Sequence, residues 1–472
     1  MSVTHLAAGE QFDTQVPLLI IGAGAAGLCA ALAAKEAGVE AVVIERDAVP
    51  SGSTALSAGL IPAAGTRFQR AKNIVDSAEM LAADIQRKAH GESDPAIVEV
   101  TSRGAAPLVE WLADRYGFPF EVVDNFNYPG HSALRMHGLP TRSGRELIDR
   151  LRSAAEANEV VILAGRIARR LFVDDERIAG VGVLRGDGVC ERIGCGALIL
   201  ACNGYGGNPE LVRRFVPEMT DALYFGHPGN RGDAVLWGES LGASLADLGA
   251  YQGHGSVATP HNILITWAVI MGGGIQINAD GRRFCDESRG YSEQAADVLR
   301  QPGGAVWNVF DERIAGVARQ FEDFRNAERA GAVVCADRLE DLAQVMRVPV
   351  QSLFPEWHEV EGLKSCSGKD RFGRCFVPDQ RCGAPLYAVK VTGALFHTQG
   401  GLAIDESARV QKRTGGVFPN LFAAGGAAAG VSGSSPAGYL SGNGLLAATV
   451  LGRLAGDMAA RHRPRTAIRR YR

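Results

Sequence analysis

Three glycines and an acid near the N-terminus have the types and the spacing to bind a dinucleotide. Gly22, Gly24 and Gly27 follow the apolar run of residues 18–21, and Glu45 lies about 20 residues further along, as the motif requires. The first glycine permits a tight turn, the second lets the backbone approach a diphosphate, and the third lets helix and strand pack closely. The diphosphate would meet the helix N-terminus, and Glu45 would bind ribose hydroxyls. The alternative is a glycine-rich turn in an α/β domain that binds no nucleotide.

Polar residues further along the chain can complete such a site. Residues 50–66 form a loop of almost only small side chains, which indicates that something large lies against it. Within it, Ser53 and Thr54 have hydroxyls that can bind phosphate, unless the loop is merely a flexible surface segment. Asp233 follows a glycine just before a predicted helix, so it either reaches the cofactor or caps that helix.

Composition and charge exclude several functional classes. The chain has 472 residues, 46% of them hydrophobic, with 59 glycines and a net charge of −3, which is typical of a globular α/β protein. The near-neutral balance gives no reason to expect nucleic acid or an anionic membrane as a partner, and no stretch has the pattern of an integral membrane span. Nine scattered cysteines fit a reducing cytoplasm, and their spacings match no metal site. We expect residues 1–16 to be an unstructured leader, and the basic residues 461–472 to be a solvated tail.

The pattern of residues changes twice along the chain. Between residues 251 and 390, charged helical segments alternate with short strands, whereas glycine-punctuated apolar segments resume at 394–405 and 416–426. This favours a Rossmann-like α/β domain built from residues 1–250 and 391–472, with an inserted α+β domain of residues 251–390.

Seven motifs, in order along nearly the whole chain, resemble a known group of flavoproteins. They are IGAGAAG, GSTALSAG, ALILACNGYGGN, GRRFCDES, HTQGGLAID, FPNLFAAGG and GYLSGNG, and the group is the superfamily of fumarate reductases and 3-ketosteroid dehydrogenases. The resemblance implies FAD in the discontinuous α/β domain and a catalytic cap in the insertion. We expect noncovalent FAD, because the loop after the cradle has no histidine or cysteine to form a flavin bond. The cofactor-binding residues implied are Gly22, Gly24, Ala25, Ala26, Gly27, Glu45, Arg46, Ser53, Thr54, Ser57, Asp233, Gly425, Ser441 and Leu445.

The sequence departs from the fumarate reductases at two positions. Tyr291 stands where they carry an arginine acid, and Tyr439 stands where they carry an arginine that binds the substrate carboxylate. The ketosteroid dehydrogenases have tyrosines at both positions, and the form with Ser441 is similar to the branch that desaturates the 4,5 bond. His254 and His397 match histidines of the fumarate reductases, which leaves room for a substrate with a carboxylate.

A third departure concerns the cofactor. AAGG replaces the usual AAGE of the superfamily, so the carboxylate that would meet the ribityl chain of FAD is missing at Gly426.

Tyrosines suit a desaturation next to a carbonyl. The reaction needs a base for the α proton, a donor for the carbonyl oxygen and an acceptor for the β hydride, which is N5 of FAD. Tyr439, with a backbone N–H from residues 441–444, can form an oxyanion hole, and Tyr291 can be the base. Because a phenol titrates near 10, Tyr291 needs a neighbour that stabilises the phenolate, for which Arg289 is a candidate.

Three functions stay open at this stage. The first is an FAD-dependent dehydrogenase of a cyclic ketone, either a 3-ketosteroid or a smaller ring such as an oxocyclohexane carboxylate, with an external electron acceptor. The second is a fumarate-reductase-like enzyme that reduces an α,β-unsaturated acid, and the third is a non-catalytic flavin electron-transfer subunit. For each tyrosine the alternative role is a packing aromatic, and for each histidine it is a structural hydrogen bond.

Overall fold

The computed structural model describes residues 1–461 except residues 8, 125 and 126, so the predicted tail at 462–472 lies outside the described residues. The chain forms two compact units. The larger unit comprises Met1–Val216, Gly226–Tyr251 and His397–Arg472, and the inserted unit comprises Pro217–Phe225 and Gln252–Phe396. The segment 217–225 was expected in the first α/β part. It belongs to the inserted unit because β11 (Leu223–Tyr224) pairs with β18 (Leu386–Thr398).

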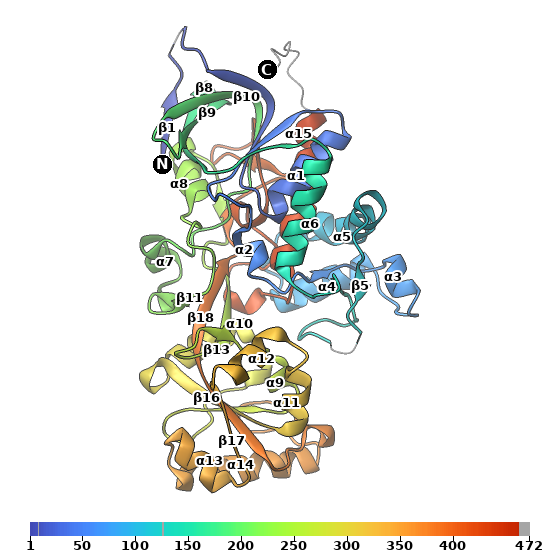
Figure 1. Ribbon diagram of the computed structural model, residues 1–472, viewed down its shortest axis with the longest axis vertical. Coiled ribbons are helices and arrows are strands. Elements are labelled where there is room, and N and C mark those ends of the chain that lie inside the picture. Colours follow the sequence, from blue (N-terminus) through green and yellow to red (C-terminus); the bar gives the residue numbers. More distant parts are fainter. Residues whose placement is uncertain (8, 125–126, 462–472) are drawn as a thin grey trace. The chain divides into compact units, whose positions relative to one another are not determined.

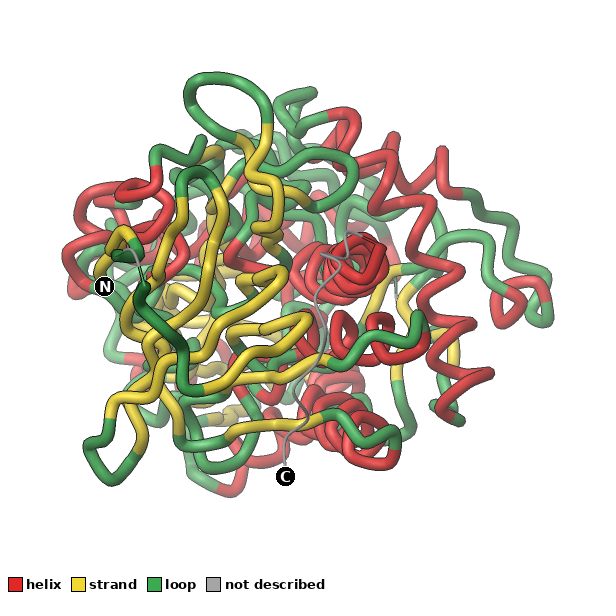
Figure 2. The backbone as a smooth tube through the Cα atoms, turned by 90° about the horizontal axis from the view of Figure 1, so that it is seen from above, coloured by secondary structure: helices red, strands yellow, loops and turns green. Residues whose placement is uncertain are grey.

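A nine-stranded sheet organises the larger unit. Its strand order is β1-β8-β9-β10-β2-β3-β7, with β21 next to β10 and β20 next to β21. The strands are β1 (Ser2–His5), β2 (Thr14–Ile21), β3 (Ala41–Ile44), β7 (Val161–Leu163), β8 (Arg166–Asp174), β9 (Arg177–Arg185), β10 (Cys190–Leu200), β20 (Arg409–Gln411) and β21 (Val417–Ala423). Strands β7, β3, β2, β10 and β21 run parallel, so their carboxyl ends share one edge. Figure 2 shows the strands in yellow with the helices beside them in red.

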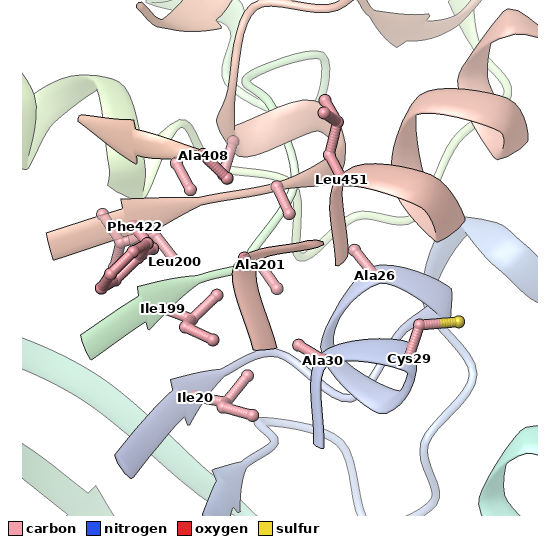
Figure 3. Close-up of a cluster of buried hydrophobic side chains, with 14 of the residues drawn as sticks. Ile20, Ala26, Cys29, Ala30, Ile199, Leu200, Ala201, Ala408, Phe422 and Leu451 are labelled. Atoms are coloured by element: carbon pink, nitrogen blue, oxygen red, sulfur yellow. The ribbon is translucent and has the colours of Figure 1, made fainter. Parts of the chain in front are cut away.

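Two helices pack closely in the core of this unit. They are α1 (Ala25–Glu36) and α15 (Asn443–Arg461). A Cβ atom on Gly452 would lie 2.3 Å from the carbonyl oxygen of Ala26, and one on Gly456 would lie 2.2 Å from that of Ala30. Glycine is therefore needed in α15 because its backbone touches that of α1. Figure 3 shows Ala26 and Ala30 of α1 in this buried cluster, with strand residues from β2, β10 and β21.

The expectation of an unstructured leader is wrong. Strand β1 pairs in parallel with β8, and Phe12 packs edge-on against Phe172 with ring centroids 5.7 Å apart. The segment is ordered by backbone pairing at the sheet edge, which its polar side-chain pattern does not reveal.

The remaining elements of the larger unit lie around this sheet. Its other helices are α2 (Gly52–Ala55), α3 (Arg67–Arg70), α4 (Ala78–Lys88), α5 (Pro95–Tyr116), α6 (Gly144–Ala157), α7 (Pro209–Phe215) and α8 (Asp233–Leu241). A small sheet has the order β4 (Ile61–Pro62), β6 (Met136–Gly138) and β5 (Glu121–Val122), and β12 (Leu245–Ala246) pairs with β19 (Gly401–Leu402).

The inserted unit has its own, mainly antiparallel sheet. The order is β14 (Ile263–Leu264), β13 (Tyr251–Ala258), β18, β16 (Ala305–Asp311) and β15 (Ile275–Ile277), with β11 and β17 (Val333–Ala336) also on β18. Its helices are α9 (Ala268–Met271), α10 (Tyr291–Leu299), α11 (Glu312–Ala318), α12 (Glu322–Arg329), α13 (Leu339–Met346) and α14 (Val350–Ser365). Alternate residues of β18 belong to two different apolar clusters, so this sheet is buried on both faces. Figure 1 shows α13 and α14 beside β17. Within the described residues, no helix combines the length and the apolar character that a membrane span needs.

Candidate active site

The predicted dinucleotide cradle lies at the carboxyl end of β2. Gly22 has a φ of +107°, and a Cβ atom there would lie 2.4 Å from the carbonyl oxygen of Ala201 at the end of β10. Gly24 is the N-cap residue of α1 and has no side chain with which to cap this helix. The backbone at the start of α1 is thus arranged to receive an anion, with Ala25, Ala26 and Gly27 in the first turn.

Two side chains that the sequence singled out hold the cradle. The Oε2 atom of Glu45 accepts a hydrogen bond from Ala23 N at 2.8 Å, and the Oγ1 atom of Thr54 accepts one from Ala25 N at 3.0 Å. Glu45 is buried directly after β3, so its carboxylate lies at the same sheet edge as the glycine turn. This is the edge at which open parallel sheets bind ligands.

These residues fit FAD. The edge offers a glycine turn that packs against the end of β10, a helix N-terminus for a diphosphate, and a buried carboxylate for ribose hydroxyls. Gly425 follows β21 with a φ of +62° and lies against Ala26, and Leu445 packs on the core in the first turn of α15.

Three other predicted cofactor residues have partners within the chain. Arg46 Nη2 and Asp233 Oδ2 are 2.6 Å apart, and burial raises the pKa of Asp233, although the charge of Arg46 opposes this. The alternative that Asp233 caps α8 is wrong, because the N-cap residue is Gly232 and no side chain caps that helix. The hydroxyl of Ser57 donates to the carbonyl oxygen of Thr54 at 2.7 Å, within its own loop.

The larger unit brings His397, Tyr439 and Ser441 together, and we call them the His397 group. The rings of His397 and Tyr439 meet edge-on with centroids 5.8 Å apart, and both Tyr439 and Ser441 are buried. A Cβ atom on Gly444 would lie 2.6 Å from the His397 ring, so the start of α15 touches the imidazole directly. This close contact with the imidazole requires a glycine at position 444.

Hydrogen bonds fix the state of His397. Ser432 Oγ donates to Gln399 Oε1 at 3.0 Å, which turns Gln399 Nε2 toward His397 Nδ1 at 2.7 Å. This contact is shorter than the 3.4 Å from Nδ1 to the carbonyl oxygen of Thr398, which favours the tautomer in which Nδ1 accepts from Gln399 and Nε2 carries the proton. Burial lowers the pKa of His397 to about 4, so at neutral pH this side chain is an uncharged donor.

A second histidine supports Ser441. His131 Nε2 lies 2.9 Å from the Ser441 carbonyl oxygen, which can only accept, so Nε2 carries the proton. Burial lowers the pKa of His131 to about 4. Its loop is fixed by Asp84, which accepts from Ser132 N at 2.8 Å and from Arg135 Nη1 at 2.6 Å.

The inserted unit forms a separate aromatic group, the His254 group, from His254, Trp267 and Tyr291. The rings of His254 and Tyr291 stack with centroids 4.8 Å apart and planes 21° apart, and Trp267 meets His254 edge-on at 5.6 Å. Tyr291 is the first residue of α10, after Gly290 with a φ of +153°. Burial lowers the pKa of His254 to about 3, so it too is uncharged at neutral pH.

A buried ion cluster anchors the turn before Tyr291. Glu287, which begins a short 3₁₀ turn, accepts hydrogen bonds from Arg283 Nη2 at 2.7 Å, Arg374 Nη1 at 3.0 Å and Gln276 N at 3.1 Å. Burial alone would raise the pKa of Glu287, but the charges of Arg374 and Arg283 lower it to about 2. Arg289, the candidate neighbour for a phenolate, is half-exposed and pairs with Asp297 at 2.9 Å.

Sequence reasoning missed several residues of these groups. Gln399 and His131 stood in the quoted HTQGG motif and in a histidine-bearing loop, but nothing in the spacing indicated their partners. Trp267 had no sequence signal at all, because an isolated tryptophan in an apolar segment is typical of a core residue.

Comparison with known proteins gives the family. The model of the FAD binding domain family matches residues 18–445. A probable fumarate reductase, Ifc3, of Shewanella frigidimarina is 32% identical over 97% of this chain and 76% of its own length.

Two solved structures are similar over nearly the whole chain. The open conformation of a flavocytochrome c3 fumarate reductase has a TM-score of 0.80 at 30% identity, over 95% of this chain and 79% of the other. The 3-ketosteroid-Δ4-(5α)-dehydrogenase of Rhodococcus jostii RHA1 has a TM-score of 0.78 at 22% identity, over 96% and 98%, which shows a shared fold. The chain belongs to the FAD binding domain family, and it is an FAD-dependent oxidoreductase of the superfamily that contains the fumarate reductases and the 3-ketosteroid dehydrogenases.

Proposed function

We propose that the protein is a dehydrogenase that introduces a carbon–carbon double bond next to the carbonyl of a cyclic ketone and passes the electrons to an external acceptor. The observation that carries this proposal is the absence of net positive charge from both candidate site groups. Each group joins a phenol to a histidine that is neutral at physiological pH, as the pKa values of about 3 and about 4 indicate. A carboxylate substrate needs a cation, whereas a ketone needs neutral donors and a base.

The buried cations of the described residues are paired with carboxylates of the chain. In the described residues, every buried arginine or lysine pairs with a carboxylate at 3.0 Å or less. They are Arg135 with Asp76 and Asp84, Arg283 with Glu287 and Asp370, Arg374 with Glu287, and Lys364 with Glu361. This supports a ketone without a carboxylate, such as a 3-ketosteroid, over an oxocyclohexane carboxylate.

Each group contributes a distinct role in this proposal. Bound FAD supplies the hydride acceptor. Tyr439 donates a hydrogen bond to the ketone oxygen, and His397, with its proton on Nε2, is a second neutral donor. Tyr291 takes the α proton, and its place at the first residue of the nine-residue helix α10 favours the phenolate, since a helix N-terminus carries partial positive charge. Nine unpaired cysteines fit our proposal that the protein works in the cytoplasm.

A second candidate is the reduction of an α,β-unsaturated acid. It has support from the name of the relative at 32% identity. It would require the neutral histidines to hold an anionic substrate without a cation, which is why we rank it below the ketone. A pure electron carrier would need neither a base nor an oxyanion donor, so it is the weakest of the three.

Anaerobic mixing separates the two enzymatic candidates. The oxidised protein is mixed with saturated-ring 3-ketosteroids, cyclohexanone and an oxocyclohexane carboxylate, and bleaching of the flavin band is followed. The reduced protein is mixed with fumarate and other enoates, and return of the band is followed. We expect bleaching with uncharged ketones. A protein that ignores every ketone but is reoxidised by an enoate would overturn the proposal.

Variants of the two tyrosines test their roles. Tyr439→Phe should slow flavin reduction by about 100- to 1,000-fold because one oxyanion donor is lost. Tyr291→Phe should slow it by about 100- to 10,000-fold while the ketone still binds, and the residual reaction should keep or enlarge the rate effect of deuterium at the α carbon, because proton removal then limits the rate more strongly. Tyr116→Phe in the larger unit and Tyr387→Phe in the inserted unit are matched controls. Rates within about twofold of the controls would remove that tyrosine from the mechanism.

A further inference from the structure

Asn203 occupies the space beside Gly426 at the edge where the cofactor binds. A Cβ atom on Gly426 would lie 2.2 Å from Asn203 Oδ1 and 3.0 Å from the backbone nitrogen of Gly204. The backbone at 426 does not itself require glycine, since its φ lies outside the left-handed region that Gly425 adopts. Glycine is needed at 426 because the Asn203 side chain already fills the volume into which any side chain there would extend.

The conformation of Asn203 is fixed from several directions. Its φ of +64° is left-handed, which asparagine tolerates better than most residues. Its Oδ1 accepts from Gly204 N at 2.8 Å, so the amide orientation is set and Nδ2 donates to Ser53 Oγ at 3.0 Å. Residue 203 follows β10, Ser53 lies in α2 after β3, and Gly426 follows β21, so all three lie at the carboxyl edge of the parallel strands.

Ser53 is placed to donate to a ligand. Its Oγ accepts from Asn203 Nδ2 and, at 2.8 Å, from Asn230 Nδ2. With both amides donating to this oxygen, the hydroxyl proton must point to an acceptor. The hydrogen bonds of the described residues provide no acceptor for it, and phosphate and ribityl oxygens are acceptors of the right kind.

We propose that Asn203, acting with Ser53 and Asn230, replaces at the FAD site the side chain that position 426 lacks. The three residues offer an amide and a hydroxyl where a side chain on residue 426 would otherwise reach the cofactor. Neither an amide nor a hydroxyl is ionised, so these three residues bring no charge to the cofactor site. The inference concerns cofactor binding, so it stands or falls independently of the ketone substrate.

A reciprocal exchange of the two positions tests the proposal. The variants are Gly426→Glu, Asn203→Gly and the double variant Asn203→Gly/Gly426→Glu, and glycine fits the positive φ of residue 203. FAD is titrated into each deflavinated protein, and the FAD content after gel filtration is measured. We expect Gly426→Glu to weaken FAD binding at least about tenfold through overpacking, and Asn203→Gly about three- to tenfold through the lost hydrogen bonds.

The double variant decides between coupling and independence. It should bind FAD within about threefold of the wild type, because the glutamate takes the vacated volume. Its flavin should have a more negative midpoint potential, since a carboxylate near the ring disfavours the electron-rich reduced form. Losses that multiply in the double variant, or a Gly426→Glu protein that binds FAD like the wild type, would overturn the proposal.

Two controls keep the test decisive. Gly186→Glu adds the same carboxylate to the larger unit, where a Cβ atom meets its nearest neighbour only at 3.9 Å, and it should leave FAD binding unchanged. If Gly426→Glu does not fold, Gly426→Ala and Asn203→Gly/Gly426→Ala take its place. The single alanine should weaken binding, and removal of the Asn203 side chain should relieve the overpacking, leaving the double variant at about the affinity of Asn203→Gly alone. An alanine that costs nothing would contradict the steric argument.

Discussion

The two candidate site groups hold a similar pair of residues, a tyrosine and a neutral histidine, by different means. In the larger unit, the His397 group is held by close approach of the backbone: Gly444 touches the His397 ring, and the carbonyl of Ser441 accepts from His131. In the inserted unit, the His254 group is held by side chains, through the stacked rings of His254 and Tyr291.

The charge around each group differs in the same way. Glu287 and Asp370 form a buried ion cluster with Arg283 and Arg374 in the inserted unit, and Glu287 lies four residues before Tyr291. In the larger unit, the contacts described for His397 come from uncharged groups, the backbone of Gly444 and the amide of Gln399, which is itself bonded to Ser432. The comparison shows that an uncharged site can be positioned either by uncharged backbone packing or by a charge cluster that is balanced within itself.

The largest effect is expected from breaking the ion cluster. Glu287→Gln leaves Arg283 and Arg374 buried without their shared carboxylate, which should lower the free energy of unfolding of the inserted unit by about 3–5 kcal/mol. Urea unfolding followed by hydrogen exchange in peptides of this unit measures it. Glu312→Gln, which removes an exposed partner of Arg319, should cost less than about 1 kcal/mol. An equal loss in the free energy of unfolding for both variants would mean that the buried cluster stabilises the inserted unit no more than an exposed ion pair does.

Acid should weaken the inserted unit through the same carboxylate. The folded-state pKa of Glu287 is about 2 against an ordinary value of 4.5, so its stabilising contribution is complete above pH 4.5 and is lost as pH falls toward 2. The contribution should amount to about 3 kcal/mol, at ~1.4 kcal/mol for each pKa unit. Unfolding measured between pH 6 and 2 should show this loss in the wild type, and the slope should be smaller in Glu287→Gln. Identical slopes would contradict the assignment.

A smaller effect is expected from one methyl group in the larger unit. Gly444→Ala places a Cβ atom 2.6 Å from the His397 ring, which should cost about 1–3 kcal/mol and shift the imidazole. Gly316→Ala is the matched change in the inserted unit, because Gly316 lies exposed within α11 with no atom near its Cβ position. It should stabilise the protein by about 0.5–1 kcal/mol. Thermal unfolding shows whether each variant is less or more stable than the wild type. Stabilisation by Gly444→Ala would contradict the close contact.

The smallest effect is expected from pH on the charge of the two histidines, because both groups hold a neutral imidazole. The pKa values of about 3 for His254 and about 4 for His397 mean that neither imidazole gains a proton as pH falls from 8 to 5. NMR of ¹⁵N-labelled histidine, with His254→Gln and His397→Gln to assign the signals, should show neutral rings over this range. A titration near 6.5 in either signal would mean that the site can carry positive charge, and the argument for a neutral ketone would fail with it.

The sequence alone determined the cofactor half of this protein. The glycine turn at Gly22, the acid at Glu45 and the interrupted apolar pattern predicted a Rossmann-like domain for FAD, and the family match confirms the fold class and the cofactor. This was possible because a dinucleotide site is built from contiguous residues whose spacing follows strand and helix geometry. The roles of Tyr291, Tyr439 and the two histidines in catalysis remain predictions.

Only the tertiary structure decided what surrounds those residues. The link from His131 to Ser441, the bond from Ser432 to the Gln399 amide and the contact of Gly426 with Asn203 each join residues more than one element apart. The formation of the N-terminal strand β1, too, depends on a partner strand 168 positions away. Side-chain periodicity records which face of an element is buried, but it does not record which distant atom lies opposite. Hydrogen bonds, packing volumes and pKa values depend on that distant atom, so they were decided by the fold.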